Sequence, residues 1–252
     1  MTAKERITMI SDLIHKDKKV SVSELSVLCN VTEETIRKDL TKLESEGLLT
    51  RVHGGAILNE QKKYKGIHFI KRKDVQSDEK RTIARLVAPL IQNGNTLFAD
   101  SSTTVAEALK YIPDELELTL VSNSTNIFLE LSSKNIHIIS TGGEFNKKYL
   151  SLQGSVAKEN IYKYNVNIAL ISCQALDMER GVQDSSEGEA EIKKLMINQA
   201  EKVILLADHT KFDRAAFVRI MELDKVDCLV TDQQPDDVWT AYCTEHHIEL
   251  VY

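Results

Sequence analysis

The sequence contains little of what marks several classes of protein. Only 3 of its 252 residues are proline and 10 are glycine, which argues against collagen-like, linker-like and disordered chains. No apolar run approaches the roughly 18 uncharged residues of a membrane-spanning helix, and the first residues lack the apolar block of a signal peptide. The cysteines, Cys29, Cys173, Cys228 and Cys243, are scattered without metal-ligand spacing. We therefore expect a soluble protein of the reducing cytoplasm, with no metal site, no cofactor and no membrane contact.

The charge that is present is unevenly distributed. Residues 1–73 contain 15 Lys and Arg against 10 Asp and Glu, and residues 74–252 contain 17 against 28. The formal net charge of −6 therefore combines a basic head with an acidic body. Such a head is typical of a segment that meets a polyanion, although ordinary surface variation produces similar imbalances. The residue pattern has to decide between the two.

The head has the pattern of three helices followed by a hairpin. Apolar residues at helical spacing predict a first helix over residues 3–16. Ser21, with Glu24 three residues later, forms a capping-box pattern that starts a short second helix. Thr32 caps a third helix, which Gly47 ends. Two helices joined by a short turn, after a packing helix, indicate a helix-turn-helix domain.

The outward face of the third helix carries cations and hydroxyl groups. Its apolar positions, Ile36, Leu40 and Leu43, are predicted to point inward. Arginine and lysine donate to guanine edges or phosphates, and threonine hydroxyls suit phosphates. On an isolated helix, such a face would more simply be a solvated surface. The preceding helix and the glycine hairpin at 48–58 instead favour a winged helix-turn-helix, in which this face contacts DNA. The residues expected to contact DNA are Thr32, Thr35, Arg37, Lys38, Thr41 and Lys42 on the helix, and Arg51, His53, Gly54 and Gly55 on the wing.

The ordered string of the head resembles a known family. Residues 20–56, "VSVSELSVLCNVTEETIRKDLTKLESEGLLTRVHGGA", closely resemble the winged helix-turn-helix of the DeoR family of bacterial sugar-catabolism regulators. The resemblance implies a transcriptional repressor that binds double-stranded operator DNA. Because one such head buries little DNA, we expect a homo-oligomer, a dimer or a tetramer, on repeated half-sites.

A polar segment separates the head from the body. Residues 59–76 carry two basic clusters, which suit a solvated connector or an additional phosphate contact. Beyond it, a helix over 78–92, interrupted by Pro89, precedes apolar runs that alternate with helix-like segments. Continuous apolar runs predict a mostly parallel sheet covered on both faces. The runs are 96–99, 118–121, 136–139, 166–171, 203–207, 228–230 and the edge run 248–251. We thus expect an α/β protein with a winged helix-turn-helix over 1–58, a linker over 59–76 and a sensor domain over 77–252.

Small polar residues follow the predicted strands. In open α/β sheets, ligands bind at the carboxyl ends of the strands. Asp100 is followed by four hydroxyl residues that open a helix, which predicts a phosphate site, although helix capping explains one hydroxyl. Some of the residues that could bind an effector also have simpler explanations. Gly142 and Gly143 could form an ordinary turn, Lys211 could be a surface lysine, and Asp100 and Asp184 could be helix caps or loop charges. The residues expected to bind the effector are Asp100, Ser101, Ser102, Thr103, Thr104, Asn123, Gly142, Gly143, Asp184 and Lys211.

The body also resembles the DeoR-family effector domain, which is similar to phosphosugar isomerases. The similarity runs through "ADSSTTVAEAL", "IISTGGEF" and "LLADHTKF", and it implies a sugar phosphate that releases the protein from DNA. Residues 172–175 and the pair His209 and Thr210 depart from the family pattern, so a relative's effector cannot be assigned to this chain. Two alternatives are a sugar-phosphate-dependent activator and an isomerase-like enzyme. The enzyme would use Asp100, Asp184, Glu187 and Lys211.

Overall fold

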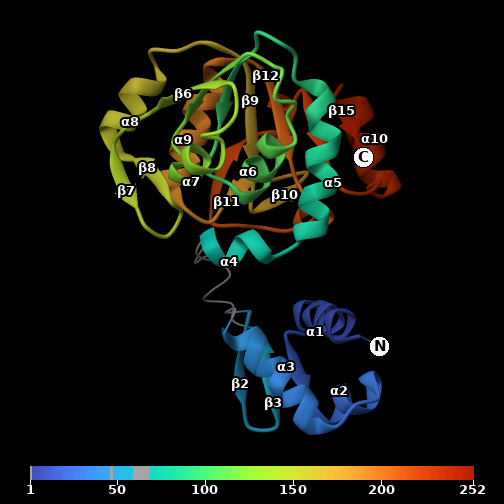
Figure 1. The fold of residues 1–252 in the computed structure, drawn as a ribbon. Helices are drawn as coiled ribbons and strands as arrows, with labels where there is room; N and C mark the ends of the chain where they lie inside the picture. Colours follow the sequence, from blue (N-terminus) through green and yellow to red (C-terminus); the bar gives the residue numbers. More distant parts are fainter. Residues whose placement is uncertain (1, 46–47, 59–68) are drawn as a thin grey trace. The chain divides into compact units, whose positions relative to one another are not determined.

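The chain consists of two compact units in a computed structural model that describes residues 2–45, 48–58 and 69–252 (Figure 1). The first unit covers residues 1–67 and the second covers residues 68–252. Within the described ranges, no helix is long and apolar enough to cross a membrane.

The first unit contains three helices and a small antiparallel sheet. Its elements are α1 (Ala3–Asp17), β1 (Lys19–Ser21), α2 (Val22–Cys29), α3 (Glu33–Ser45), β2 (Leu49–Val52) and β3 (Gly55–Leu58). The side chain of Ser21 caps α2, and the hydroxyl of Thr32 accepts from the backbone N–H of Thr35 at 3.3 Å, so both predicted helix starts are confirmed. The predicted end at Gly47 lies outside the described residues. β1 was not predicted, because three residues are too few to show a pattern and their partner strand, β3, lies far along the chain.

The second unit is built on a seven-stranded parallel sheet, as the apolar runs predict. The strand order is β15-β14-β12-β9-β4-β5-β6. The strands are β4 (Thr96–Ala99), β5 (Leu118–Ser122), β6 (Ile136–Ser140), β9 (Val166–Ser172), β12 (Ala200–Leu206), β14 (Cys228–Val230) and β15 (Glu249–Val251). Every strand pairing in this sheet is parallel, and β15 lies at an edge as expected.

Helices cover both faces of this sheet (Figure 1). One apolar core joins the sheet to α5 (Ser77–Val87), α6 (Thr103–Lys110) and α7 (Thr125–Glu130). The other joins it to α8 (Gly154–Ile161), α9 (Glu187–Asn198) and α10 (Asp237–Glu245). This two-sided burial explains why the strands are continuously apolar.

Two parts of the second unit differ from the expectation. Residues 69–74, assigned to the linker, form the helix α4 (Phe69–Asp74) and belong to the second unit. Small antiparallel strands add two further sheets that the sequence pattern does not reveal. They are β7 (Glu144–Asn146) with β8 (Ser151–Gln153), and β10 (Ala175–Asp177), β11 (Gly181–Asp184) and β13 (Val218–Met221). The predicted interruption at Pro89 is confirmed, because α5 ends at Val87 and a 3₁₀ turn over Ala88–Leu90 follows.

The only tryptophan of the chain lies in α10. Trp239 is buried and packs edge-on against Phe212, with the ring centroids 4.9 Å apart. Its indole N–H donates to the carboxylate of Asp213 at 3.0 Å. Trp239 thus contacts the segment that directly follows the carboxyl end of β12.

Candidate functional site

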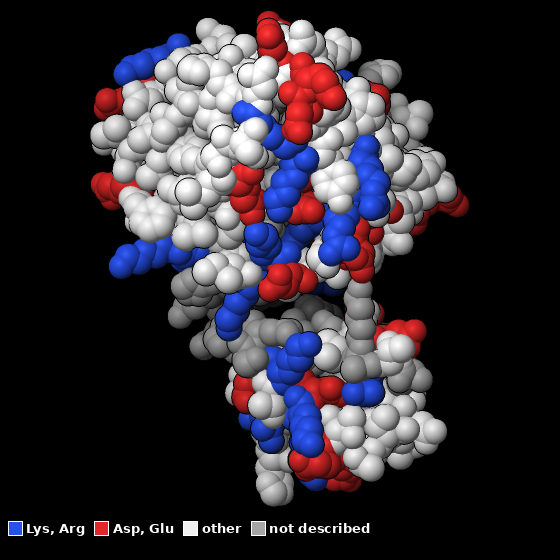
Figure 2. All heavy atoms as spheres, viewed as in Figure 1, with Lys and Arg blue, Asp and Glu red and all other residues white. Residues whose placement is uncertain are grey.

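The third helix of the first unit presents the predicted polar face. Ile36, Leu40 and Leu43 are buried, as expected, while Arg37 and Lys38 are exposed. Lysine and arginine side chains gather over this unit together with acidic ones (Figure 2). Thr32, Thr41 and Lys42 are also exposed, and Thr35 is half-buried. The helix therefore offers cations and hydroxyls along one accessible face.

Acidic side chains hold Arg37 in place on this helix. Its guanidinium lies 2.5 Å from Glu33 and 4.0 Å from Glu34. All three side chains are substantially exposed, so these pairs contribute little stability in water. They restrict the orientation of the guanidinium without removing it from the surface.

The wing is tied to the third helix by Arg51. Its guanidinium donates to the hydroxyl of Thr41 at 2.8 Å, and its backbone N–H donates to the carboxylate of Glu44 at 2.8 Å. Arg51, His53 and Gly54 are exposed at the end of the hairpin. These bonds hold the predicted helix and wing residues in one surface.

Gly55 has a different place from the other predicted DNA contacts. It is buried, and a Cβ built on it would lie 2.1 Å from the carbonyl oxygen of Val20 in β1. Glycine is required here because β1 passes directly over the backbone. Its role is to pack the sheet, and it offers no surface to DNA.

The second unit has its topological switch point between β4 and β9. From β4 the chain proceeds through β5 to β6, and from β9 it proceeds through β12 and β14 to β15, in the opposite direction across the sheet. Ligands of open α/β sheets bind at such a point, outside the carboxyl ends of the strands. Asp100 follows β4 and Ser172 ends β9, so both lie at this crevice.

A buried ammonium group joins two of the predicted carboxylates. Lys193 of α9 lies 2.5 Å from Asp184 and 3.2 Å from Asp100, and it donates to the carbonyl oxygen of Ser172 at 2.8 Å. Burial alone would lower the pKa of Lys193, but the two carboxylates raise it overall. Asp100 also accepts from the backbone N–H groups of Ser102 and Ser172. Both carboxylates are thus engaged in shaping the crevice, and they position Lys193.

Glu189, one helical turn before Lys193, is a second buried charge that the sequence analysis missed. Its carboxyl group accepts from the hydroxyls of Ser101 and Ser151 and from the side-chain amide of Gln153. Burial raises its pKa, although the hydrogen bonds from Ser101 and Ser151 and the charge of Lys193 oppose the rise. The sequence carries no clear signal for either residue, because the burial of this face of α9 becomes visible only in the fold.

The loop after β4 supplies buried hydroxyl groups. Ser101, Ser102, Thr103 and Thr104 are all buried. Ser102 caps α6, because its hydroxyl accepts from the N–H of Val105 at 3.2 Å, and Ser101 donates to Glu189. Among the described residues, no hydrogen bond occupies the hydroxyls of Thr103 and Thr104. Together with the first N–H groups of α6, they form a surface that suits an anion.

The strands on one side of the switch point bring Asn123 and Gly143 to the same end. Asn123, after β5, is fully buried; its amide donates to the carbonyl of Leu152, while its Oδ1 has no partner among the described residues. Gly143, after β6, has φ +109°, and a Cβ there would meet the carbonyl of Gln153 at 2.3 Å. Gly142 has φ +64° and donates its N–H to Ser140. Gly142 therefore serves the turn, and Gly143 also allows its close packing against β8.

On the other side of the switch point, Lys211 follows β12. Its ammonium lies 3.8 Å from the carboxylate of Asp208. Burial would raise the pKa of Asp208, but Lys211 and the bonds from Thr210 lower it overall. Burial raises the pKa of Cys173 to about 12, while Lys211 and Lys193 oppose the rise. Both cations thus favour the charged form of this buried thiol, which directly follows β9.

The carboxylates that an isomerase would need as a free base are poorly placed for that role. Asp100 and Asp184 are both paired with Lys193, and Glu187 is exposed at the first residue of α9. No group of three or more His, Cys, Asp or Glu side chains in the described part of the chain could hold a metal ion. The crevice offers recognition groups more clearly than a free carboxylate base.

Comparison with known families agrees with both units. Residues 6–62 match the DeoR-like helix-turn-helix domain, and residues 75–233 match the DeoR C terminal sensor domain. The chain belongs to the DeoR family. Its winged helix-turn-helix and its seven-stranded sensor are thus those of a DeoR-family transcriptional regulator, as the resemblance implied.

Several regulators of this family match nearly the whole chain. The HTH-type transcriptional regulator YulB of Bacillus subtilis is 40% identical, covering 94% of this chain and 91% of its own. The L-fucose operon activator of Haemophilus influenzae is 31% identical over 98% of both chains. The glycerol-3-phosphate regulon repressor of Escherichia coli is 31% identical over 99% of both. Ribose 5-phosphate isomerase A of Methanocaldococcus jannaschii gives a TM-score of 0.42 at 15% identity, covering 54% of this chain and 55% of that one.

Proposed function

We propose that this DeoR-family protein is a DNA-binding repressor of a carbohydrate-catabolism operon that a phosphorylated sugar releases from its operator. The observation that carries the effector half is the switch-point crevice. There, two threonine hydroxyls begin α6 three residues after Asp100, and Asp100 pairs with a lysine that also pairs with the buried Asp184. Hydroxyls and helix N–H groups suit a phosphate, and the partnerless Oδ1 of Asn123 suits a sugar hydroxyl.

For the DNA half, the proposed contacts are the exposed face of α3 and the wing. Thr32, Thr35, Arg37, Lys38, Thr41 and Lys42 would meet the major groove, and Arg51, His53 and Gly54 would meet the adjacent backbone or minor groove. The names of the relatives include both repressors and an activator. Activation by the same effector is therefore the second candidate for this chain.

Release requires that the effector distinguish two arrangements of the protein. An effector that bound the DNA-competent and DNA-incompetent states equally would shift nothing. We propose that the protein acts in the cytoplasm as a dimer or tetramer, because a single head buries too little DNA for useful affinity. We also propose that it binds the sugar phosphate without converting it, since the crevice carboxylates are committed to Lys193.

The test replaces Ser102 and Thr103 by alanine in the full chain. The double variant is expected to bind the native upstream region as the wild type does, and to lose release by every compound of a sugar-phosphate panel that releases the wild type. A variant that still responds would remove the phosphate loop from the proposal. Turnover of any panel compound by the pure protein would instead support the isomerase.

A further inference from the structure

The helix α4 carries an arginine whose surroundings differ from those of the exposed cations near it. The guanidinium of Arg72 lies over the rings of Phe69 and Tyr149, 5.7 and 5.4 Å from their centroids. Phe69 and Tyr149 are both buried. Two aromatic rings therefore hold the planar group in one orientation.

One edge of this guanidinium lacks partners. Nε and Nη2 of Arg72 are buried, and neither makes a hydrogen bond to any described residue. A charged donor that is desolvated without a partner is costly, so such a group calls for an explanation. The Nε–Nη2 edge is one that binds a carboxylate or a phosphate through two parallel bonds.

Two connections link Arg72 to the switch-point crevice. The ammonium of Lys80 donates to the carbonyls of Arg72 and Val75 at 2.5 Å each, which secures the end of α4. Lys80 is buried; burial and the neighbouring cations Lys211 and Arg72 lower its pKa to about 8, while Asp208 opposes that shift. Lys80 therefore lies within electrostatic reach of both Arg72 and the residues after β12.

The second connection runs through the segment that contains Tyr149. The carbonyl of Lys148 accepts from the N–H of Phe69 at 2.8 Å, at the start of α4. Two residues after Tyr149, Ser151 donates to Glu189 inside the crevice. Tyr149 thus contacts Arg72 through its ring, and the chain that follows it reaches Glu189 through Ser151.

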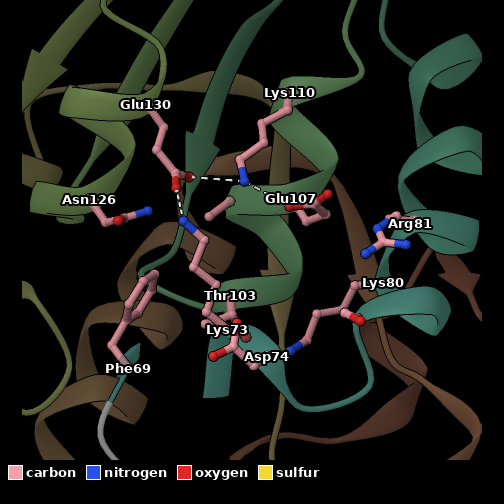
Figure 3. Close-up of a pocket in the computed structure, with 12 residues that line it drawn as sticks. Phe69, Lys73, Asp74, Lys80, Arg81, Thr103, Glu107, Lys110, Asn126 and Glu130 are labelled. Carbon is pink, nitrogen blue, oxygen red and sulfur yellow. Dashed lines mark hydrogen bonds and ion pairs between the residues drawn. The ribbon is translucent and has the colours of Figure 1, made fainter. Parts of the chain in front are cut away.

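The space beside α4 is not filled by side chains. A cavity of about 150 Å³ lies between α4, α5, α6 and α7, and it is lined by Phe69, Lys80 and Thr103 among others. Figure 3 shows Lys80 extending toward α4 on one side of this cavity and Glu130 between Lys73 and Lys110 on the other. The first residue of α6 and the ammonium that secures α4 therefore face a common space.

We propose that Arg72 is a further effector ligand, whose Nε–Nη2 edge binds the phosphate group held at the start of α6, and that Lys80 is a positioning residue for it. This inference rests on the proposed function and adds a residue of α4 to the binding site. α4 is the first described element after residues 59–68, which connect the two units. A phosphate bound by Arg72 therefore acts directly on the helix that begins the sensor.

The experiment measures the thermal stability of the full chain during titration with inorganic phosphate, with chloride adjusted to keep the ionic strength constant. Bound ligand raises the melting temperature by mass action, and the phosphate midpoint is defined as the phosphate concentration at which the stabilisation equals RT ln 2, where it equals the dissociation constant. Arg72→Gln is expected to raise the phosphate midpoint at least about tenfold, because it removes a charge-assisted pair of bonds. Arg72→Lys, which retains the charge, is also expected to weaken binding, because lysine lacks the two-pronged edge.

A matched control exists in the same unit. Arg85 of α5 is exposed and lies over the ring of Tyr111 at 5.7 Å, so Arg85→Gln also removes an arginine stacked on a tyrosine. This variant is expected to keep the wild-type phosphate midpoint. Circular dichroism and the melting temperature without phosphate establish that each variant is folded. Arg72→Lys carries the test if Arg72→Gln fails that check.

The outcomes separate this inference from the proposed function. Equal midpoints for wild type and both Arg72 variants, with a weakened Ser102 and Thr103 double variant, would overturn the inference and leave the proposed function standing. A weakened Arg72 variant beside an unaffected double variant would show that Arg72 binds phosphate elsewhere, which also overturns it. A wild type whose melting temperature rises with neither phosphate nor glucose 6-phosphate would overturn both. A lower midpoint for glucose 6-phosphate than for phosphate identifies the ligand as a phosphomonoester, and the reverse identifies free phosphate.

Discussion

Lys193 organises the crevice through contacts with residues from three other elements. Its ammonium touches Asp100 after β4, Asp184 at the end of β11 and the last residue of β9. A buried ion pair adds little net stability relative to apolar packing, but removal of one partner leaves an uncompensated charge. The consequence is that this residue supports both the fold and the shape of the site.

Lys193→Met is accordingly expected to destabilise the second unit by about 3–5 kcal/mol, because two buried carboxylates lose their cation. Urea unfolding at neutral pH measures the change. The neighbouring Lys194 is exposed, so Lys194→Met should alter the free energy of unfolding by no more than about 0.5 kcal/mol. Similar effects for the two variants would contradict the structural role of Lys193.

Glu189 predicts a pH dependence with a definite sign. Burial raises its pKa in the folded protein above the ordinary value of 4.5, so between these two values the folded state binds more protons than the unfolded state. The free energy of unfolding then falls as the pH rises through this window, and the loss persists at neutral pH. Glu189→Gln abolishes the titration, so its stability relative to the wild type should increase from pH 4.5 to pH 8. The exposed Glu187→Gln serves as the control, and a difference independent of pH would refute the prediction.

Among the residues of the candidate site, those in loops can be predicted from the sequence better than those in helices. The hydroxyls after β4 and Asn123 stand out because they follow apolar strands directly. Glu189 and Lys193 do not, because a helix carrying both charges resembles a solvated surface helix until the sheet is known to cover that face. Arg72, the ligand proposed above, does not stand out for a similar reason, since it lies in a basic cluster that resembles a connector.

Among the elements, α3 carries the sharpest prediction about DNA. Arg37→Ala is expected to weaken operator binding by about 1–3 kcal/mol if its guanidinium reads a guanine, and to relax sequence preference at that position. Electrophoretic mobility shift with native and single-substituted operators measures both. Arg81 is exposed and pairs with Asp78 in the sensor, so Arg81→Ala should leave retardation unchanged. Unaltered retardation by the Arg37 variant would exclude that contact.

The small sheet of the first unit depends on Gly55. A Cβ at this position would lie 2.1 Å from the carbonyl of Val20, and Gly55→Ala is expected to destabilise this unit by about 1–3 kcal/mol through forced backbone movement. Ile57 is in the same strand with its side chain exposed, so Ile57→Ala serves as the control and is expected to have a smaller effect on stability. Hydrogen exchange that resolves the two units should show faster opening of residues 19–58 only in the Gly55 variant. Equal protection in both variants would contradict the close packing.

Long apolar runs and helix caps were predictable, and the short antiparallel strands were not. Strands of the main sheet are buried on both faces, so each produces a continuous apolar run that needs no knowledge of its neighbours. β1, β7 and β10 are each three residues long, and their pairing is decided by partners that the fold brings close. α4 was missed for a related reason, since six residues with one buried side chain, Phe69, show no periodicity.

For the whole molecule, the uneven charge predicts how operator binding responds to salt. We expect the basic first 73 residues to supply the phosphate contacts, in which case the logarithm of the binding constant falls linearly with the logarithm of salt concentration. Lys38→Ala is expected to reduce that slope by about 0.9 and to weaken specific and random duplexes alike, if this lysine meets a phosphate. Fluorescence anisotropy over a salt series measures the slope. Lys194→Ala, in the acidic body, should leave it unchanged, and an unaltered slope for Lys38→Ala would remove that contact.

The position of the single indole group gives the molecule an optical reporter of its own. Trp239 is bonded to Asp213 and packed on Phe212, and both follow Lys211 within two residues. Any shift of the segment after β12 therefore changes the polarity and quenching around the one strong fluorophore in the chain. If effector binding moves this segment, the emission of unlabelled protein is expected to follow occupancy of the sensor, at equilibrium or after rapid mixing, while the DNA-binding domain contributes no tryptophan signal.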